Sequence, residues 1–360
     1  MDHVRATRNY GFRCPVFGEG RLEKGKVYYS YSKFAQDVTS DSAGKIVNVT
    51  APPIFTNETV EADLENARVL VIHSGGYGDT VTLGILLKQL QEERGSMFDV
   101  CCHYDKFTQI LSPFGFKCNW VSYPPVADEL SNYDYVLPEL CKLVKNPTAL
   151  VNRPLISLLA EGLGLSDHFQ NVQYSVPGSA KRDMRLPNTN RIRIGINFDS
   201  NSPLRSYPKA LQPAVVKLLL VLGCELFFLG RESISEAIDC GSEVVRDYTG
   251  KTSILQLAAL LDQMDFVLAV DSLAANLSGI LGKRTLTLMS TTGEGVFGHF
   301  RSVSGIGSAM KCSPCGSVQS HSRCPLSFPN CKAFYHPSVG PDIIVKTVVK
   351  NLSEHFGGMA

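Results

Sequence analysis

Apolar and polar positions alternate in blocks along most of this chain, and the clearest block runs from residue 253 to 293. It opens with Ile254, Leu257 and Leu261 at helical spacing. Two apolar runs, 266–270 and 285–289, have the length of buried strands, and a helix of about residues 273–281 separates them. The pattern predicts helix, strand, helix, strand and loop in succession, as in a parallel α/β sheet.

The same alternation begins at Arg68 and predicts two α/β halves. Residues 175–190 are polar and rich in proline and charge, which is typical of a linker between them. The predicted strands are 68–73, 98–103, 120–122, 135–137, 192–198 and 225–229, and the further predicted helices are 80–94, 153–163, 215–222, 233–240 and 342–355.

Domain boundaries follow from these blocks. Residues 1–66 have glycine-containing turns and short β-prone runs and predict a small β-rich appendage. Residues 67–180 and 190–360 are the two expected Rossmann-like domains, and residues 305–340 read as irregular. Two such domains would form a cleft between them, which is a preferred place for a small-molecule site.

Polar residues follow the two buried strands of the first block. Asp271 comes directly after one strand, and Thr291, Thr292 and Gly293 come after the other. Ligands of open α/β sheets bind outside the carboxyl ends of the strands, so these residues lie where a ligand is expected.

A glycine-rich loop, Ser74 to Asp79, joins the strand 68–73 to the next helix. Gly75, Gly76 and Gly78 let the backbone turn sharply and let a ligand approach closely. Asp79 has two interpretations that the sequence leaves open: a cap of the helix, or a general base facing the ligand.

Composition narrows the classes of function. The formal net charge of +1 over 360 residues gives no bias toward nucleic acid, and no apolar run has the length of a membrane span. The N-terminus lacks the apolar core of a signal peptide, and eleven cysteines without such a signal indicate a reducing compartment. We therefore expect a cytoplasmic protein.

Four of the cysteines are clustered: Cys312, Cys315, Cys324 and Cys331. Four thiolates that include a C-x2-C pair suit a tetrahedral zinc or iron ion, and the segment has too few apolar residues to fold on its own core. Such a site is expected to be structural, since protein would fill all four ligand positions. The alternatives are four reduced thiols or a redox-active pair.

Taken together, GGYGDTV, NFDSNSPLRSYP, SILQLAALLDQMDFVLAVDS and LSGILGKRTLTLMSTTG resemble glycosyltransferase family 9, the ADP-heptose heptosyltransferases, over about residues 68–355. The resemblance implies a GT-B fold and an inverting transfer of sugar, heptose as first expectation, from a nucleotide-diphosphate donor to a hydroxyl acceptor. No catalytic metal is implied. In the protein-modifying autotransporter heptosyltransferase branch, a similar cysteine pattern holds iron.

The resemblance also implies roles for single residues. Asp79 matches the base that deprotonates the acceptor, and Asp271 matches the aspartate that holds the sugar hydroxyls. Arg205 falls near a basic residue that contacts the diphosphate, and Glu232 falls near an acid that binds ribose. Thr291, Thr292 and Gly293 match the loop near the phosphates.

The chain departs from the family pattern where the sugar is read. The usual DTGxxH is DSLAAN here, so that Leu273 replaces a glycine and Asn276 replaces a histidine. Because these positions lie where the family binds the donor sugar, the identity of that sugar is left open. Two alternatives stay open, a non-catalytic nucleotide-sugar-binding protein and a GT-B sugar-nucleotide epimerase. The acceptor is a glycan, a lipid-linked molecule or a protein, and a lipid-linked acceptor would place the enzyme at the inner membrane face.

Overall fold

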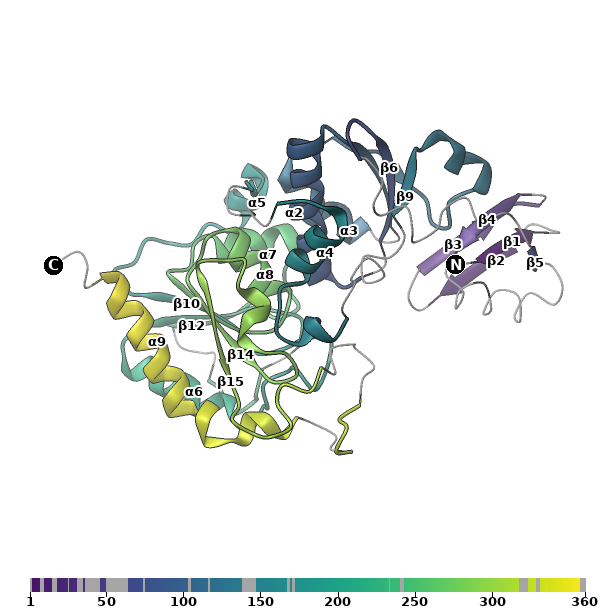
Figure 1. The fold of residues 1–360 in the computed structure, drawn as a ribbon. Helices are drawn as coiled ribbons and strands as arrows, with labels where there is room; N and C mark the ends of the chain where they lie inside the picture. The colour runs from purple at the N-terminus through teal and green to yellow at the C-terminus, as the bar shows by residue number, and fades with distance from the viewer. Residues whose placement is uncertain are drawn as a thin grey trace. The chain divides into compact units, whose positions relative to one another are not determined.

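The chain forms two compact units, Met1–Lys145 with Leu159–Asp167, and Asn146–Leu158 with His168–Ala360. The computed structural model shows each unit in ribbon form (Figure 1). It describes residues 2–6, 10–14, 18–24, 26–30, 35, 46–49, 64–73, 75–102, 105–115, 117–137, 147–166, 169, 172–232, 234–239, 243–316, 323–327 and 331–356.

The first unit is built on a parallel sheet in the order β8-β7-β6-β9. Its central strand β6 is buried along five of its six positions, as expected for a parallel sheet covered on both faces. The helix α2 is the next element after β6 along the chain, and it begins at Tyr77, two residues after Gly75. The bounds are β6 Arg68–His73, α2 Tyr77–Arg94, β7 Met97–Cys102, α3 Asp105–Leu111, β8 Trp120–Val121 and β9 Tyr135–Leu137.

Strands of the N-terminal region pack against one face of this sheet. They form a three-stranded antiparallel sheet, β4-β1-β5, and a hairpin, β2-β3. The fully buried Leu22 and the buried Tyr28 join Leu70 and Ile72 of β6 in one apolar cluster. A buried leucine contributes roughly 1.5–3 kcal/mol. The bounds are β1 Asp2–Ala6, β2 Tyr10–Cys14, β3 Gly18–Leu22, β4 Val27–Ser30 and β5 Ile46–Val49.

The second unit contains a six-stranded parallel sheet in the order β12-β11-β10-β13-β14-β15. Numbered along the chain, this is the order 3-2-1-4-5-6 of a doubly wound dinucleotide-binding sheet, whose direction of winding reverses between β10 and β13. The bounds are β10 Arg193–Asn197, β11 Glu225–Phe228, β12 Val245–Asp247, β13 Phe266–Val270, β14 Thr285–Met289 and β15 Val303–Gly307.

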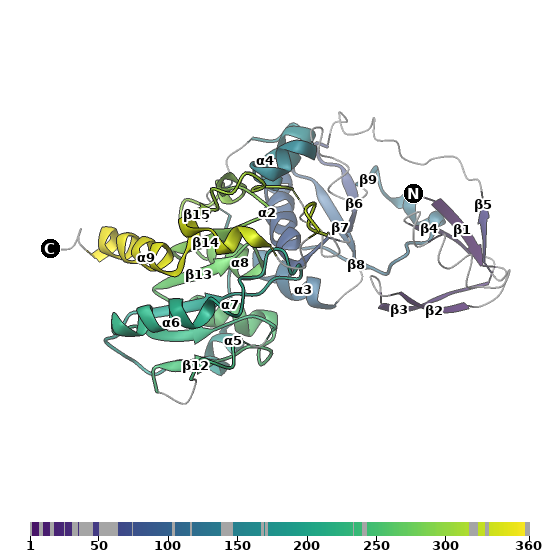
Figure 2. The same ribbon diagram turned by 90° about the horizontal axis from the view of Figure 1, so that it is seen from below.

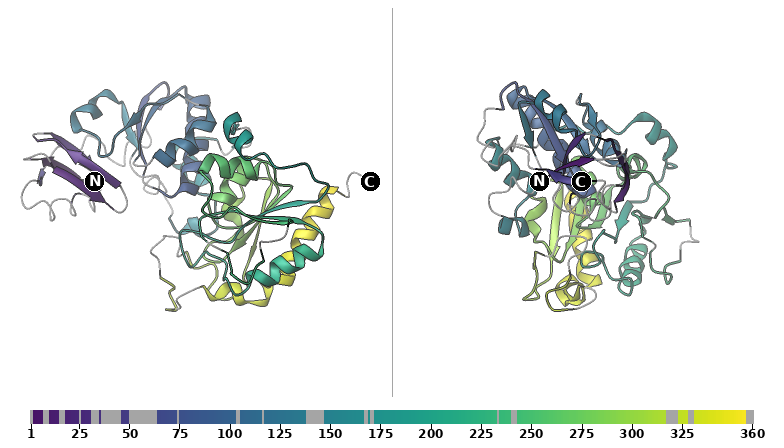
Figure 3. Two further views of the ribbon diagram at one scale, coloured as in Figure 1. Left: turned by 180° about the vertical axis from the view of Figure 1, so that it is seen from behind. Right: turned by 90° about the vertical axis from the view of Figure 1, so that its right-hand side faces the viewer.

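Helices cover both faces of the six-stranded sheet (Figures 2 and 3). On one face, α6 and α9 pack side by side and bury Val215, Leu219, Ile344 and Val348 against alternate strand residues. On the other, α7 and α8 pack against each other, and α8 contacts β13 and β14. The bounds are α6 Gln212–Val221, α7 Ile254–Leu261, α8 Leu273–Ile280 and α9 Pro341–Phe356.

The remaining described elements are short. No helix among the described residues is both long and apolar enough to cross a bilayer. These elements are α4 Leu155–Leu163, α5 Gly178–Asp183 and 3₁₀ helices at Ser112–Phe114, Ala127–Asn132, Pro147–Val151, Glu294–Phe297, Lys332–Tyr335 and Pro337–Val339.

Two local predictions are wrong, and a third segment contains a helix that the sequence did not predict. The helix expected over 233–240 is absent from 234–239, which form turns in which the Ser235 hydroxyl accepts the Ala237 amide. Serine favours such local bonds over helix. The polar segment 175–190 contains the helix α5, whose Lys181 pairs with Asp262 at 2.7 Å. The region read as irregular from residue 305 contains most of β15.

Candidate functional site

The carboxyl ends of β10, β11 and β13 meet at the point where the second sheet reverses its winding. The Ser272 hydroxyl, just after β13, donates to Asn197 Oδ1 at the end of β10 over 2.7 Å. The Asn197 amide in turn donates to the Leu229 carbonyl at 3.1 Å and to Asp199 Oδ1 at 2.8 Å. These bonds fix the edge of the crevice where open α/β sheets bind ligands.

Three of the predicted site residues, Arg205, Asp271 and Thr292, come together at this edge. Asp271 is 8% exposed as a residue, and its Oδ2 accepts from the Thr292 hydroxyl at 2.9 Å. Arg205 Nη1 lies 3.4 Å from the same oxygen, and Nη2 donates to Asn201 Oδ1 at 2.5 Å. The guanidinium is thereby held in one orientation, as binding of a phosphate by arginine requires.

The loop after β14 leaves buried polar atoms without partners. Thr291 is 1% exposed, and neither its hydroxyl nor Arg205 Nε has a hydrogen-bond partner within the described residues. Unsatisfied buried polar atoms are uncommon and call for an explanation, such as a ligand that supplies the partner. At Gly293 a Cβ would lie 2.1 Å from Asn152 Oδ1, so a larger residue would have to displace the Asn152 side chain. The Gly293 amide donates to the Val151 carbonyl at 2.7 Å.

Glu232 is near this edge but not in the Arg205 cluster. Its side chain is 58% exposed and pairs with the adjacent Arg231 at 3.2 Å. Its backbone amide donates to Asp199 Oδ2 at 3.3 Å. Burial raises the pKa of Asp199, and the amides of Arg231 and Glu232 partly offset that rise. Asp199 thus holds the backbone of the loop from which Glu232 projects.

In the first unit, Asp79 lies in the first turn of α2 and is exposed. Its Oδ2 accepts from the Gly76 amide at 2.8 Å, which is the geometry of a helix cap. Gly75 is needed for close packing, because a Cβ there would lie 2.7 Å from the His73 ring and 3.0 Å from the Asp79 Cβ. Gly78 lies within α2 itself. The capping role is therefore present, and the role of base stays a prediction.

A buried histidine at the end of β6 holds this loop through Thr80, and this role was not predicted from the sequence. His73 is 3% exposed, its Nε2 lies 3.0 Å from the Thr80 hydroxyl, and that hydroxyl donates to the Gly76 carbonyl at 2.9 Å. The hydroxyl has one hydrogen, so Nε2 is the donor and the ring is the Nε2–H tautomer. Burial lowers the pKa of His73 to about 4.

This shift predicts a loss of stability in acid. The unfolded chain takes up a proton on His73 near pH 6.5, whereas the folded chain resists protonation down to about pH 4. The contribution is complete above pH 6.5 and falls by about 3 kcal/mol as the pH drops to 4. Urea unfolding should show a shallower pH dependence for His73→Gln, which keeps a donor but does not titrate. Identical pH slopes in the two proteins would contradict the assignment.

The four clustered cysteines line one cavity of about 20 Å³, together with Leu204, Ser290 and Thr291. Burial raises the pKa of the Cys331 thiol; a backbone hydrogen bond with Ala333 lowers it, and the nearby thiols of Cys315, Cys312 and Cys324 raise it. All four are free thiols, and among the residues that are described no group of three or more His, Cys, Asp or Glu side chains is close enough to hold a metal. Residues 317–322 and 328–330 of this segment lie outside the described ranges.

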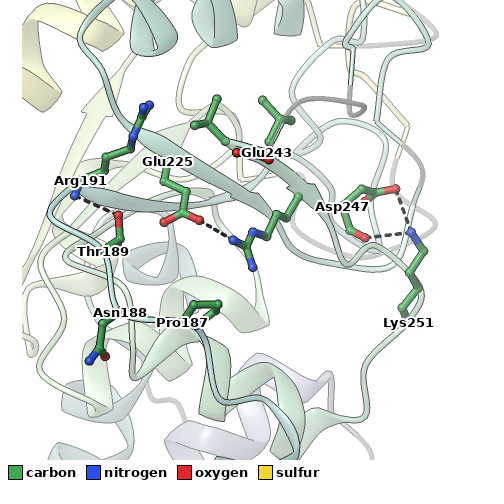
Figure 4. A pocket seen from close by; sticks show the side chains of 11 residues that line it. Pro187, Asn188, Thr189, Arg191, Glu225, Glu243, Asp247 and Lys251 are labelled. Atoms are coloured by element: carbon green, nitrogen blue, oxygen red, sulfur yellow. Dashed lines mark hydrogen bonds and ion pairs between the residues drawn. The ribbon is translucent and has the colours of Figure 1, made fainter.

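A larger cavity, of about 790 Å³, lies along the edge strand β12 (Figure 4). Its charged side chains pair with one another: Glu225 with Arg246 at 3.0 Å, and Asp247 with Lys251 at 3.4 Å. None of the predicted site residues lines it. Its size alone does not make it the reactive site, because four of its charged side chains are engaged in these two ion pairs.

Several residues of the carboxyl edge were missed from the sequence. Asn197, Asp199, Asn201 and Ser272 all act through side-chain bonds to this edge. Three of them lie in the stretch NFDSN, directly at the end of a predicted strand. A cluster of short polar residues at that place was the available signal.

The sequence matches the family model of glycosyltransferase family 9 (heptosyltransferase) over residues 136–324, just over half of the chain. No curated protein is similar enough in sequence to match.

Three solved structures have a similar fold over most of this chain. ADP-heptose lipopolysaccharide heptosyltransferase II of Escherichia coli is 13% identical, with a TM-score of 0.59, over 80% of this chain and 99% of that one. A glycosyl transferase family 9 protein of Veillonella parvula is 14% identical, with a TM-score of 0.58, over 82% and 99%. The iron-containing dodecameric glycosyltransferase TibC of enterotoxigenic E. coli is 11% identical, with a TM-score of 0.60, over 98% and 91%. The predicted class, a GT-B-like α/β fold with parallel sheets, is confirmed.

Proposed function

Because the chain belongs to glycosyltransferase family 9 (heptosyltransferase), and is therefore an enzyme that takes a sugar from a nucleotide-sugar donor, we propose that it transfers heptose from ADP-heptose to a hydroxyl group with inversion. The observation that carries the proposal is the cluster of Arg205, Asp271 and Thr292 at the reversal point of the second sheet.

The cluster has the chemistry that a diphosphate leaving group requires. Departure of the nucleoside diphosphate leaves negative charge on its phosphate oxygens, which cationic and amide donors stabilise. The guanidinium of Arg205 is oriented by Asp271 and Asn201, and its buried Nε keeps a donor without a partner among the described groups. The hydroxyl of Thr291, the residue before Thr292 in the loop after β14, has no partner among the described residues and is a second available donor. These residues can stabilise the leaving group without a catalytic metal.

Roles for the remaining residues follow from the reaction. An acceptor hydroxyl is a weak nucleophile, and the exposed carboxylate of Asp79 is the proposed base that removes its proton as it attacks the anomeric carbon. Attack opposite to the leaving group inverts that carbon. Asp271 is the proposed contact to the sugar hydroxyls, and Glu232, whose carboxylate is exposed, the proposed contact to the ribose.

Asn276 stands where the family pattern usually has a histidine, and this difference supports a donor preference that differs from that of other family members. The Asn276 side-chain amide donates to the Ser272 carbonyl at 3.0 Å, so part of its hydrogen-bonding capacity is spent within α8. ADP-heptose remains the first donor to test. The proposed acceptor is a hydroxyl group on a glycan, a lipid-linked molecule or a protein, and a lipid-linked acceptor would bring a cytoplasmic enzyme to the inner membrane face.

A thermal-shift screen with ADP-, UDP-, GDP- and dTDP-sugars tests the donor. A ligand that binds only the folded chain, at a hundredfold excess over its dissociation constant, raises the midpoint by roughly 5 °C or more. We expect that rise with ADP-heptose and not with the other nucleotide classes. A rise with UDP-, GDP- or dTDP-sugar alone would overturn the choice of ADP, and no rise with any of them would overturn the function.

The four-cysteine segment is the proposed site of a structural zinc or iron ion. The chemistry of the donor set suits either metal, since Cys312, Cys315, Cys324 and Cys331 line one cavity and are unpaired by disulfides. As described, no three of them lie close enough to hold an ion, so binding would have to draw the thiols together. Thiolates are preferred ligands of both metals, and a bound ion would replace the mutual repulsion of the four sulfurs by attraction. The ion would order the segment and take no part in the transfer.

Metal analysis of the purified protein should find roughly one equivalent of zinc or iron per chain. Cys312→Ser should lose most of it, because three thiolates bind more weakly than four. Cys118→Ser, which removes a thiol of the other unit, is the matched control and should retain the metal. A wild-type protein that is folded and free of metal would contradict the proposal.

A further inference from the structure

One arm of the cysteine segment, residues 311–316, is bonded directly to the loop after β14. The Ser313 hydroxyl donates to the Ser290 carbonyl at 2.7 Å, and the Gly316 amide donates to the Thr291 carbonyl at 2.8 Å. The two acceptors are consecutive carbonyls. Together these bonds fix the peptide planes from which the Thr291 and Thr292 side chains project.

The same loop is held from two other sides. The Ser290 hydroxyl donates to the carbonyl of Leu204, the residue before Arg205, at 2.8 Å. The Gly293 amide donates to the Val151 carbonyl at 2.7 Å. The arm 311–316 is therefore one of three supports, and it is the one that carries Cys312 and Cys315.

The space between the thiols and the loop is small. The cavity of about 20 Å³ is lined both by Leu204, Ser290 and Thr291 and by the four cysteines. At Gly316 the backbone has φ of +74°, and a Cβ would lie 3.0 Å from Val151 Cγ2. The left-handed backbone favours glycine there, and the arm packs closely against Val151, whose carbonyl accepts the Gly293 amide of the loop.

We propose that the arm 311–316 is a positioning element of the donor loop, through which binding of a nucleoside diphosphate is coupled to the state of the Cys312 and Cys315 thiols. Ser313 and Gly316 fix the direction of the Ser290 and Thr291 carbonyls. The loop that contains these carbonyls thereby holds its hydrogen-bond donors toward the phosphates. Any change that shifts the thiols, by metal loss or by modification, shifts the loop. The inference rests on the proposed function, because the ligand of the loop is taken to be the donor diphosphate.

Titration calorimetry of the full chain with ADP measures the coupling. Ser313→Ala should raise the dissociation constant of ADP roughly 3- to 10-fold, the effect of one lost neutral hydrogen bond. Ser313→Thr, which keeps the hydroxyl, should restore the wild-type affinity. The matched control is Ser304→Ala, where a serine hydroxyl donates to the Thr285 carbonyl at the opposite end of β14. It should leave the affinity unchanged.

Coupling is reciprocal, which gives a second measurement that loss of fold would not mimic. Saturating ADP should slow alkylation of the exposed Cys315 by N-ethylmaleimide, identified by mass spectrometry, and should leave alkylation of Cys118 in the other unit unchanged.

The outcomes separate the two claims. An unchanged ADP affinity in Ser313→Ala, or an equal loss in Ser304→Ala, overturns this inference while the wild type still binds ADP. Cys315 alkylation that is indifferent to ADP overturns it as well. A wild type that binds none of the nucleoside diphosphates overturns the proposed function, and this inference falls with it.

Discussion

Replacing Asp79 by asparagine is expected to slow sugar transfer roughly 10²- to 10⁴-fold, the usual contribution of a general base. The amide cannot take a proton from the acceptor hydroxyl. Its oxygen can still accept the hydrogen bond from the Gly76 amide that caps α2. The fold should therefore survive, and the measurement is the turnover of ADP-heptose beside the affinity for ADP.

A carboxylate elsewhere on the same helix provides the control for Asp79. Glu92 is a surface residue of α2 that pairs with Lys88 at 3.5 Å, and Glu92→Gln makes the same change of charge. It should leave turnover unchanged. Wild-type turnover in Asp79→Asn would leave Asp79 as a helix cap and nothing more.

Arg205→Ala is expected to weaken ADP binding about 10- to 100-fold, since hydrogen bonds to charged groups contribute roughly 1.5–3 kcal/mol. The loss has two causes. The phosphates lose a cationic donor, and the nearly buried Asp271 carboxylate loses the partner at 3.4 Å that neutralises it. Because an unpaired buried charge is unfavourable beside phosphates, the change should exceed that of a surface arginine.

Arg231→Ala is the matched control. Arg231 carries the same charge close to the same edge, but it is exposed and pairs with Glu232 in solvent. Exposed pairs contribute about 0–1 kcal/mol, so ADP affinity should change by less than about fivefold. Equal losses in the two variants would mean that general charge near the site, rather than the oriented Arg205, binds the phosphates.

Two inner strands of the second sheet, β13 and β14, could be predicted to the residue. Phe266–Val270 and Thr285–Met289 are continuous apolar runs because both of their faces are covered, and the structure has the predicted bounds. The edge strands Val245–Asp247 and Val303–Gly307 were not predicted. Each pairs with a neighbouring strand on one side only, and its few apolar residues are interrupted by arginine and aspartate or by serine and glycine.

Only part of the candidate site could be predicted from the sequence. Asp271 and Thr292 could be placed at the ligand edge because each follows a predicted strand. The bond between Ser272 and Asn197 joins residues 75 positions apart, and it depends on β10 lying beside β13. Strand order is a property of the assembled sheet and no local pattern in either segment specifies it. His73 was hidden for another reason, since a histidine that ends an apolar strand gives no signal of its buried partner.

The contact between the N-terminal strands and β6 bears on which changes in these strands the first unit can tolerate. Leu22 and Tyr28 lie in the same apolar cluster as Leu70 and Ile72, and the Tyr28 hydroxyl accepts the Glu23 amide at 2.8 Å. Removal or exchange of these strands would therefore expose the apolar residues of β6, the strand that precedes the Asp79 loop. Among the described residues of these strands, substitutions at positions outside the shared cluster are expected to leave that cluster intact.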